Sequence, residues 1–561
     1  MQMKKYIGTT ALLAVLASPA FAQTVIDQTA SGIAQNSAAS SVIFSPGVVV
    51  NSVLGQESTN VANGVGVLGA FAVSSPYTVL QEAGPGIVEQ NAVNTNIAGS
   101  NASAVANVTV GGNQLASNLT NFANIAPGAG STGAIGQIAG NTELFASNTM
   151  LATVQNGNAS IVGANGLGGA GFQTAAGALN TGGVLVTDST ALKLNQEVID
   201  RNTITATNSA IANAVASGLP TLDPSISTLN QKSSIGVNQM TFTSVAGPAS
   251  VALSGAQNGP VSLNNDSLLG TLGNTAVAFT GTPAPGYNIG TNAPGDGIAV
   301  ISGVTQNASF GLNNVSGGTG VSISLAAGAG APPPAIPLGF TQTVDGLALG
   351  GDPVVTAPGN VLPGVVNGIA ARTNTGSSTV TGVQGTLTQN YNMQLNSITT
   401  GGTLAGTATQ TASDILQTAP VYTGGPLPVI GYANAVVADT VAGPSTITNV
   451  SQRMDQTINL AASTGTGAGG LNLTQTGNNI ALSSNNVQAA LGSTSATIAG
   501  AQQLANSALN VASLAGAGGT ITQGSGGTIS LSATNQLAAV SPYNASVSGF
   551  QSSSTAFNVI K

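Results

Sequence analysis

A short unit of an apolar residue, Thr or Ser, and then Gln recurs through the second half of the chain. In every copy another apolar residue follows five or six positions after the Gln, and Gly- or Asn-rich sequence lies between them. Apolar and polar residues that alternate on short arms are typical of β-strands, and Gly and Asn are typical of turns. Each unit therefore predicts a strand, a turn and a second strand. The copies end at Gln306, Gln342, Gln389, Gln452, Gln475 and Gln523.

A repeated Gln has a physical use when strands stack. Equivalent side chains then lie one above another at the strand spacing, so that amide groups hydrogen-bond along the stack while small apolar residues form the dry face. The intervals between successive Gln positions, 36, 47, 63, 23 and 48, follow no fixed period, which disfavours a propeller or a leucine-rich array. We expect a mainly β fold, an irregular β-solenoid or β-stack of degenerate strand–turn–strand repeats.

Two segments predict a minor helical content. Leu115, Leu119, Phe122 and Ile125 have helical spacing, and so do parts of the Ala- and Gln-rich segment 498–514. We expect helices here that face the core or cap the stack, and a partner-binding helix is the alternative.

The N-terminal segment 1–22 has the pattern of a secretory signal. Lys4 and Lys5 precede an apolar stretch over positions 7–17, and Ala20 and Ala22 form the Ala-x-Ala motif of a cleavage site. The apolar stretch is too short for a membrane anchor, which needs about 20 residues. No later segment offers an apolar run long enough to predict a transmembrane helix.

Clusters of Pro and Gly punctuate the middle of the chain and indicate turns or linkers. They occur within residues 281–286, 331–337, 352–363 and 424–428. After the signal peptide over residues 1–22, we therefore expect three regions. These are an N-terminal Ala/Asn/Gly-rich β region with some helix (23–280), a Pro/Gly-punctuated middle (281–370) and a C-terminal Gln-repeat β region (371–561).

Charge is scarce in this chain, and that scarcity excludes many functions. It has 8 Lys and Arg, 16 Asp and Glu, no His and no Cys, and 4 % of its residues are charged where about 25 % is usual. The usual ligand sets of zinc, haem and iron–sulfur sites need His or Cys, and so do the common nucleophilic triads. We expect no cofactor, and no nucleic-acid partner because phosphate binding rests on clustered Lys and Arg.

The carboxylates are too scattered to predict a catalytic or metal site. A glycosidase needs two of them about 5–9.5 Å apart, and no local spacing suggests such a pair. Asp–Gly pairs at Asp296 and Asp345 could suggest calcium, but they lack the Gly-Gly-x-Gly-x-Asp repeat of calcium-binding β-rolls. We interpret these pairs as turns, and expect neither catalytic nor metal-binding residues.

One segment resembles a known family. Residues 473–481, Leu-Thr-Gln-Thr-Gly-Asn-Asn-Ile-Ala, resemble the curlin repeat of curli-type surface fibres, Gln-x-Gly-x-x-Asn-x-Ala, with the gap from Gly477 to Asn479 one residue short. Gln90–Ala92 and Gln306–Ala308 are shorter echoes of the motif. The resemblance implies secretion, export unfolded through a curli-type outer-membrane channel, and assembly as β-rich surface fibres. Holdfast-anchoring proteins of stalked bacteria use a similar export system.

Together these features predict a secreted, non-catalytic structural protein on the surface of a Gram-negative bacterium. It would mediate attachment as a curli-like fibre subunit, an adhesin or a holdfast anchor. The expected partners are further copies or related surface subunits, the export channel and surface polysaccharide. The alternatives are a secreted β-helix enzyme that acts on polysaccharide and an S-layer-like lattice protein.

Overall fold

The computed structural model describes the chain in thirteen segments. They comprise residues 24–45, 48–102, 104–162, 171–215, 223–260, 266–281, 297–325, 339–349, 365–382, 387–417, 432–465, 470–515 and 518–561. The signal-peptide residues, including Ala20 and Ala22, lie outside these segments.

The strands form two long ladders, sheet A and sheet B, which face each other. Sheet A consists of nine rungs: β1 (Thr24–Ser45), β4 (Tyr77–Ser100), β6 (Ser131–Val154), β9 (Ser189–Ala214), β12 (Ala249–Asn258) with β13 (Ser267–Thr280), β16 (Val321–Leu325) with β17 (Phe340–Asp345), β18 (Ala348–Leu349) and the first part of β19 (Val365–Thr381), β21 (Leu404–Gln417) with β22 (Tyr432–Ala442), β25 (Leu471–Gly492), and β27 (Ile521–Val540).

Sheet B has nine rungs as well, and the chain alternates between the two sheets. Its rungs are β2 (Val49–Val65) with β3 (Phe71–Val73), β5 (Ala106–Pro127), β7 (Gly157–Val162) with β8 (Gly171–Val186), β10 (Ser225–Ser227) with β11 (Leu229–Ser244), β14 (Gly297–Ser302) with β15 (Thr305–Gly317), the second part of β19 with β20 (Leu387–Thr400), β23 (Pro444–Thr448) with β24 (Val450–Ser463), β26 (Ser495–Leu514), and β28 (Asn544–Ile560).

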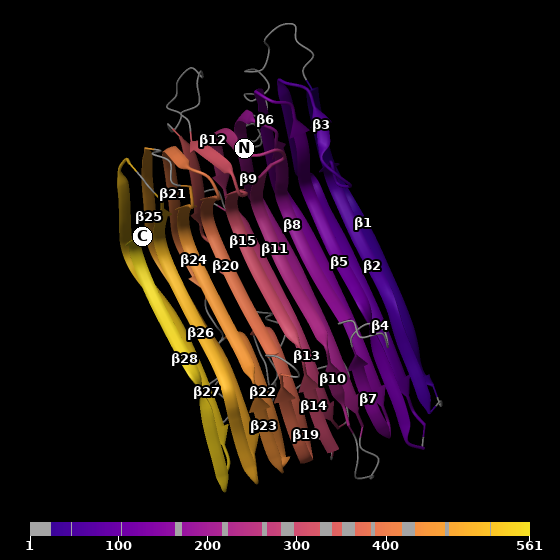
Figure 1. Ribbon diagram of the computed structural model, residues 1–561. Coiled ribbons are helices and arrows are strands. Elements are labelled where there is room, and N and C mark those ends of the chain that lie inside the picture. Colours follow the sequence, from indigo (N-terminus) through magenta and orange to yellow (C-terminus); the bar gives the residue numbers. More distant parts are fainter. Residues whose placement is uncertain are drawn as a thin grey trace.

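One sheet A rung followed by one sheet B rung makes a coil, and nine coils stack in chain order. Figure 1 shows this order as an unbroken change of colour from β1 to β28 across the stack. All the rung pairings given above are parallel, and each inner rung pairs with the rung before it and the rung after it. The prediction of a mainly β solenoid is therefore confirmed.

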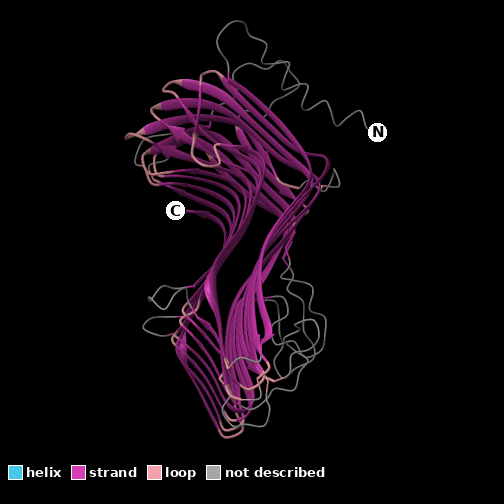
Figure 2. Ribbon diagram, turned by 90° about the vertical axis from the view of Figure 1, so that its right-hand side faces the viewer, coloured by secondary structure: helices cyan, strands magenta, loops and turns pink. Residues whose placement is uncertain are grey.

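The predicted helices are wrong. The described residues contain no helix, and Figure 2 draws only strands and connections. Leu115 to Ile125 lie in β5, and residues 498–514 lie in β26. The described part of the chain accordingly has no helix that could cross a membrane.

The turns expected inside the Gln repeats do not reverse the chain. In sheet B the strand runs through the repeat to a kink at the Asn seven residues after the Gln, and in sheet A the chain bends within the repeat. In β25, for example, the segment around Gln475 runs on from Leu471 to Gly492 without reversing direction, and Asn479 alone adopts a left-handed conformation with φ of 51°. Both arms of the unit therefore pair parallel with the same two neighbouring strands. The repeat is a bent rung and not a hairpin.

The space between the sheets holds three apolar columns that run along the stack. The first column lies where sheet A strands begin and includes Val79, Ile125 and Leu194. A middle column includes Leu144, Leu179 and Ile204, and a third, where sheet A strands end, includes Val108, Ile161 and Ala212. These residues are at most 1 % exposed. Long, narrow columns suit a chain whose apolar residues are mostly small.

The strands on either side of the predicted region boundaries belong to one stack. β13, which ends at Thr280, pairs with β19, and β19 pairs in turn with β22. The Pro- and Gly-rich clusters, apart from Gly281, lie outside the described residues. Each of them connects two strands of the stack, for example β16 to β17 and β21 to β22.

Candidate functional site

The six predicted Gln residues lie on two separate ladders. Gln342, Gln475 and Gln523 are in sheet A, and Gln306, Gln389 and Gln452 are in sheet B. Each ladder has one Gln in each of the nine coils. The sheet A ladder is Gln28, Gln81, Gln137, Gln196, Gln257, Gln342, Gln410, Gln475 and Gln523, and the sheet B ladder is Gln56, Gln114, Gln173, Gln231, Gln306, Gln389, Gln452, Gln503 and Gln551.

Direct hydrogen bonds between the amides connect each ladder from end to end. In both ladders the Nε2 of every Gln from the second coil onward donates to the Oε1 of the Gln one coil earlier, over 2.6–2.8 Å. The side chains of the inner coils are buried, as Gln231 and Gln410 at 0 % exposed illustrate. The structure thus contains the amide ladders that the repeats predict.

Two Asn ladders accompany the Gln ladders, and the sequence reasoning missed them. In sheet B the Asn stands seven residues after each ladder Gln, at Asn63, Asn121, Asn180, Asn238, Asn313, Asn396, Asn459, Asn510 and Asn558. In sheet A the ladder is Asn94, Asn148, Asn208, Asn274, Asn367, Asn434, Asn486 and Asn535, and Ala38 takes its place in the first coil. A Gln-x6-Asn search of the sequence would have revealed the first of them.

Each sheet B ladder Asn has a positive φ, between 51° and 57°. This left-handed region is costly for most residues, and Asn is among the few that visit it routinely. Two requirements therefore favour Asn at this position: the left-handed backbone conformation and the side-chain amide that joins the ladder.

The Gln ladder of one sheet faces the Asn ladder of the other, and hydrogen bonds from both ladders join the two sheets. Asn180 Nδ2 donates to the carbonyl oxygen of Glu197, the residue after ladder Gln196, over 2.8 Å. In return, Gln196 Nε2 donates to the carbonyl oxygen of Asn180 over 2.6 Å. We call this sheet A Gln and sheet B Asn pair of ladders the first amide layer. It lies between the first and middle apolar columns.

A second amide layer repeats the arrangement with the sheets exchanged. Asn208 Nδ2 of sheet A donates to the carbonyl oxygen of Lys232, which follows ladder Gln231 of sheet B, over 2.8 Å. Gln231 Nε2 donates to the carbonyl oxygen of Thr275, which follows ladder Asn274, over 2.9 Å. Among the described residues, no ladder amide is a buried group without a partner. Such fully satisfied buried networks specify one packing of the chain.

The ladders have opposite directions. Gln Nε2 donates towards the first coil, whereas Asn Nδ2 donates towards the last coil, as from Asn121 to Asn180. The cross-sheet bonds fix these directions, because a backbone carbonyl only accepts and the amide nitrogen must therefore face it. The two ends of the stack consequently present different hydrogen-bonding groups.

Both ends of the stack are open strand edges. The last strand, β28, is exposed over nearly its whole length, and Phe550, Phe557 and Ile560 are 60–62 % exposed. At the other end, Val25 and Ile33 of β1 are 58 % and 67 % exposed. β27 and β28 contain neither a charged residue nor Pro, while β1 and β2 carry one charge each, Asp27 and Glu57. Ordinary edge strands are guarded by Lys, Pro or bulges.

Burial raises the pKa values of three described carboxylates, and two of them, Glu197 and Asp439, lie on the outer faces. Burial, and secondly the charge of Asp266, raises the pKa of Glu197 above its usual 4.5. Burial also raises the pKa of Asp439, although Arg372, 3.1 Å away, opposes that shift. Each has a packing explanation, and neither belongs to a cluster of acidic groups that could hold a metal in the described part of the chain.

The sequence contains two Asp–Gly pairs that could suggest calcium. Asp345, from one of these pairs, lies at the end of β17. Its Oδ1 accepts a hydrogen bond from Ser413 Oγ over 2.8 Å, and Gly346 after it has a φ of 73°. Asp345 thus bonds its partner residue on the neighbouring rung β21, and the chain bends at the following Gly346. Asp296 lies outside the described residues.

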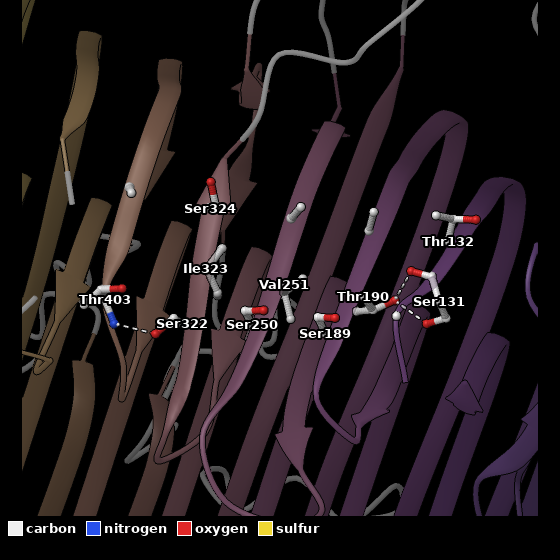
Figure 3. Close-up of a pocket in the computed structure, with 14 residues that line it drawn as sticks. Ser131, Thr132, Ser189, Thr190, Ser250, Val251, Ser322, Ile323, Ser324 and Thr403 are labelled. Atoms are coloured by element: carbon white, nitrogen blue, oxygen red, sulfur yellow. Dashed lines mark hydrogen bonds between the residues drawn. The ribbon is translucent and has the colours of Figure 1, made fainter. Parts of the chain in front are cut away.

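A shallow hollow of about 330 Å³ crosses five neighbouring rungs of sheet A near the start of the strands (Figure 3). Ser189, Ser250, Ser322 and Thr403 lie side by side along it on successive rungs. Its lining residues carry only hydroxyl groups, apolar side chains or, at Gly130, none. The hollow therefore offers weak hydrogen bonds but no acid, base or strong nucleophile.

Comparison with known proteins gives no relative from which a function could be transferred. No family model, curated protein or solved structure matches the chain.

Proposed function

We propose that the chain is a non-catalytic structural protein of the cell surface, a fibre subunit, adhesin or anchor that mediates attachment. The observation that carries this proposal is the nine-coil stack itself, which is joined throughout by amide ladders and ends in two open strand edges without Lys, Arg or Pro. Such a body is stiff and elongated, and it can be extended at either end.

Three features of the sequence support a place outside the cell. The segment 1–22 resembles a secretory signal, the segment 473–481 resembles a curlin repeat, and a charge content of 4 % leaves little electrostatic repulsion between copies. A route through a curli-type export channel follows from the resemblance. Surface polysaccharide and related subunits are the expected contacts.

The hydroxyl-lined hollow favours a structural role over the polysaccharide-active enzyme. Glycoside hydrolysis uses two carboxylates on opposite sides of the bond that is cleaved. None of the residues that line the hollow carries a carboxylate.

Deletion of the gene tests the proposal directly. We expect the deletion strain to lose adhesion to a solid surface, and the full-length gene to restore it. Protease added to intact cells should degrade the protein. A gene that lacks residues 2–22 is the matched control: its product should stay inside the cell and restore nothing. Normal attachment by the deletion strain, or depolymerisation of a surface polysaccharide by the purified protein, would contradict the proposal.

A further inference from the structure

We propose that the last coil of one molecule docks on the first coil of a second copy, head to tail and in a single register. This inference adds a mode of assembly to the proposed function. It is tested with purified protein, so it can fail while the role in attachment stands, and the reverse also holds.

The hydrogen-bonding groups at the two ends are complementary. In the inner coils, the Oε1 of each ladder Gln accepts a hydrogen bond from the Gln of the following coil. At the last coil, the Oε1 atoms of Gln523 and Gln551 face the side on which that following coil would lie. At the first coil, Gln28 and Gln56 lack the ladder bond that their equivalents donate, and Gln56 Nε2 donates only to the carbonyl oxygens of Ala38 and Thr95. A second copy would therefore extend both Gln ladders across the junction.

The sheet B Asn ladder has the opposite direction and fits as well. Asn63 of the first coil donates to Asn121, so its Oδ1 is the acceptor that an earlier coil would use. Asn558 of the last coil accepts from Asn510, so its Nδ2 is the matching donor. Three of the four ladders thus continue from copy to copy, and the fourth ends where Asn535 meets Ala38.

Parallel pairing selects one orientation of the partner, because every rung of the chain pairs parallel with its neighbours. Two last coils related by a twofold rotation would set their strands antiparallel. Only the head-to-tail arrangement continues the parallel pairing and keeps Gln in line with Gln in both Gln ladders. It also places β1 of the second copy beside β27, and β2 beside β28, as the tenth coil of a continuous solenoid.

The sizes of the apolar side chains agree with this register. If Gln551 lies beside Gln56 of the next copy, Phe557 lies over Ala62. Within the chain this position is filled by Thr120 in the second coil and then by apolar residues of the middle column, Leu179, Val237, Leu312, Leu395, Ile458 and Leu509. The largest side chain of the series, Phe557, therefore stands on the open last coil and would meet the smallest, Ala62, on the first. In sheet A the same register places Ile521 over Ile26.

Engineered cysteines test the register, because the chain has no Cys of its own. In the proposed register, Ser554 lies beside Thr59 of the next copy on the outer face of sheet B. Neighbouring strands are about 4.8 Å apart, within the Cα separation that a disulfide spans. A mixture of Ser554→Cys and Thr59→Cys proteins should form a disulfide-linked pair under mild oxidation, and each variant alone should not.

Asn51→Cys is the matched control for register. Asn51 lies on the same outer face of β2, eight residues and about 26 Å from Thr59, so it should not cross-link with Ser554→Cys. It should cross-link with Ser546→Cys, which is its own partner in the proposed register. Disulfide-linked pairs from either single variant alone, equal yields with Asn51→Cys and Thr59→Cys, or no cross-linking with any combination would overturn the inference.

A second experiment tests the contact without cysteine. Phe557→Lys should reduce the sedimenting fraction of the purified protein at least tenfold, since an ammonium group would be buried at the junction. Phe550→Lys is the control, because Phe550 is equally exposed but belongs to the outer face, beside Gln502. Circular dichroism should show unchanged strand content in both. Equal sedimentation of the Phe557→Lys and wild-type proteins would contradict the proposed contact.

Discussion

At the scale of the residue, the left-handed Asn of sheet B combines two tasks that are usually separate. Asn180, with a φ of 54°, bends the strand and also donates to Asn238 and to the carbonyl oxygen of Glu197. Gly would serve the backbone and Gln the ladder, but neither would serve both. The same residue type therefore recurs at this position in all nine coils.

Substitution of Asn180 separates these two tasks. Asn180→Gly should lower the free energy of unfolding by about 3 kcal/mol, because buried groups of Glu197, Asn121 and Asn238 lose their partners. Asn180→Ala should cost about 1 kcal/mol more, since Ala adds the strain of a left-handed conformation. Urea denaturation followed by circular dichroism measures both. Asn107→Ala, on the exposed outer face, is the control and should change little; an equal effect at Asn107 would show that the buried bonds are unimportant.

The raised pKa of Glu197 gives a pH-dependent prediction. Because the folded-state pKa lies above the usual 4.5, this carboxyl favours folding below pH 4.5, and that contribution is lost as the pH rises through the folded-state value. Glu197→Gln should therefore raise the melting temperature at pH 7 and leave it nearly unchanged at about pH 3. The exposed Glu143→Gln is the control. A Glu197→Gln protein that is less stable than wild type at pH 7 would contradict the assignment of burial as the cause.

At the scale of the element, the left-handed residue explains why the sequence indicates helices that do not exist. Along β5 the inward positions are 114, 116, 118 and 120, but after Asn121 they become 123 and 125. The kink shifts the alternation by one residue, so that Leu119 and Phe122 both lie on the outer face although they are three positions apart, while Ile125 faces inward. A strand with a phase shift and a helix then look alike in the sequence.

The strand class and the six Gln ladder positions could be predicted, because alternation and a repeated amide are local signals. Two further members, Gln196 and Gln231, end the variants Leu194-Asn-Gln196 and Leu229-Asn-Gln231, which extend the pattern upstream. The remaining ten ladder Gln residues could not be placed. Inserted segments change the interval between successive sheet B Gln residues from 48 to 83, which hides the period, and upstream members such as Gln137 lack the preceding Thr or Ser. The sheet B Asn ladder has its signal in the interval of seven from Gln, whereas in sheet A the interval from Gln to the ladder Asn varies from 11 to 25 and gives no local pattern. The curlin-like segment matches Asn479 to the Asn of the known repeat instead. Asn479 is a kink residue of sheet A that bonds Asp414.

A coil is the unit that can be removed. Deletion of residues 114–172 removes 59 residues, the interval between Gln114 and Gln173, and each ladder should close again with one member fewer. We expect a folded protein with an unchanged circular dichroism spectrum per residue. Deletion of 115–172 leaves one extra residue in the strand, which would turn every following side chain to the other face, and should yield aggregated or unfolded protein. Equal behaviour of the two deletions would contradict the ladder as the determinant of register.

At the scale of the whole molecule, assembly should be insensitive to salt. The four edge strands carry Asp27 and Glu57 as their only charged side chains, and the proposed junction sets them beside Thr522 and Ser552. Interactions between charges weaken as the ionic strength rises. Hydrogen bonds between side-chain amides and apolar contacts between the coils are not weakened by this screening. The sedimenting fraction should be similar at about 0.05 M and about 1 M NaCl. A tenfold loss at high salt would indicate an electrostatic contact elsewhere on the surface.

The opposed directions of the Gln and Asn ladders have an electrostatic consequence. Aligned amide groups add their dipoles, as they do along an α-helix, and a single ladder would build a field that grows with its length. Here each amide layer pairs a Gln ladder, whose positive end is at the first coil, with an Asn ladder, whose positive end is at the last. The side-chain dipoles oppose one another within each layer, so that a tenth coil or a hundredth adds no net field to the stack.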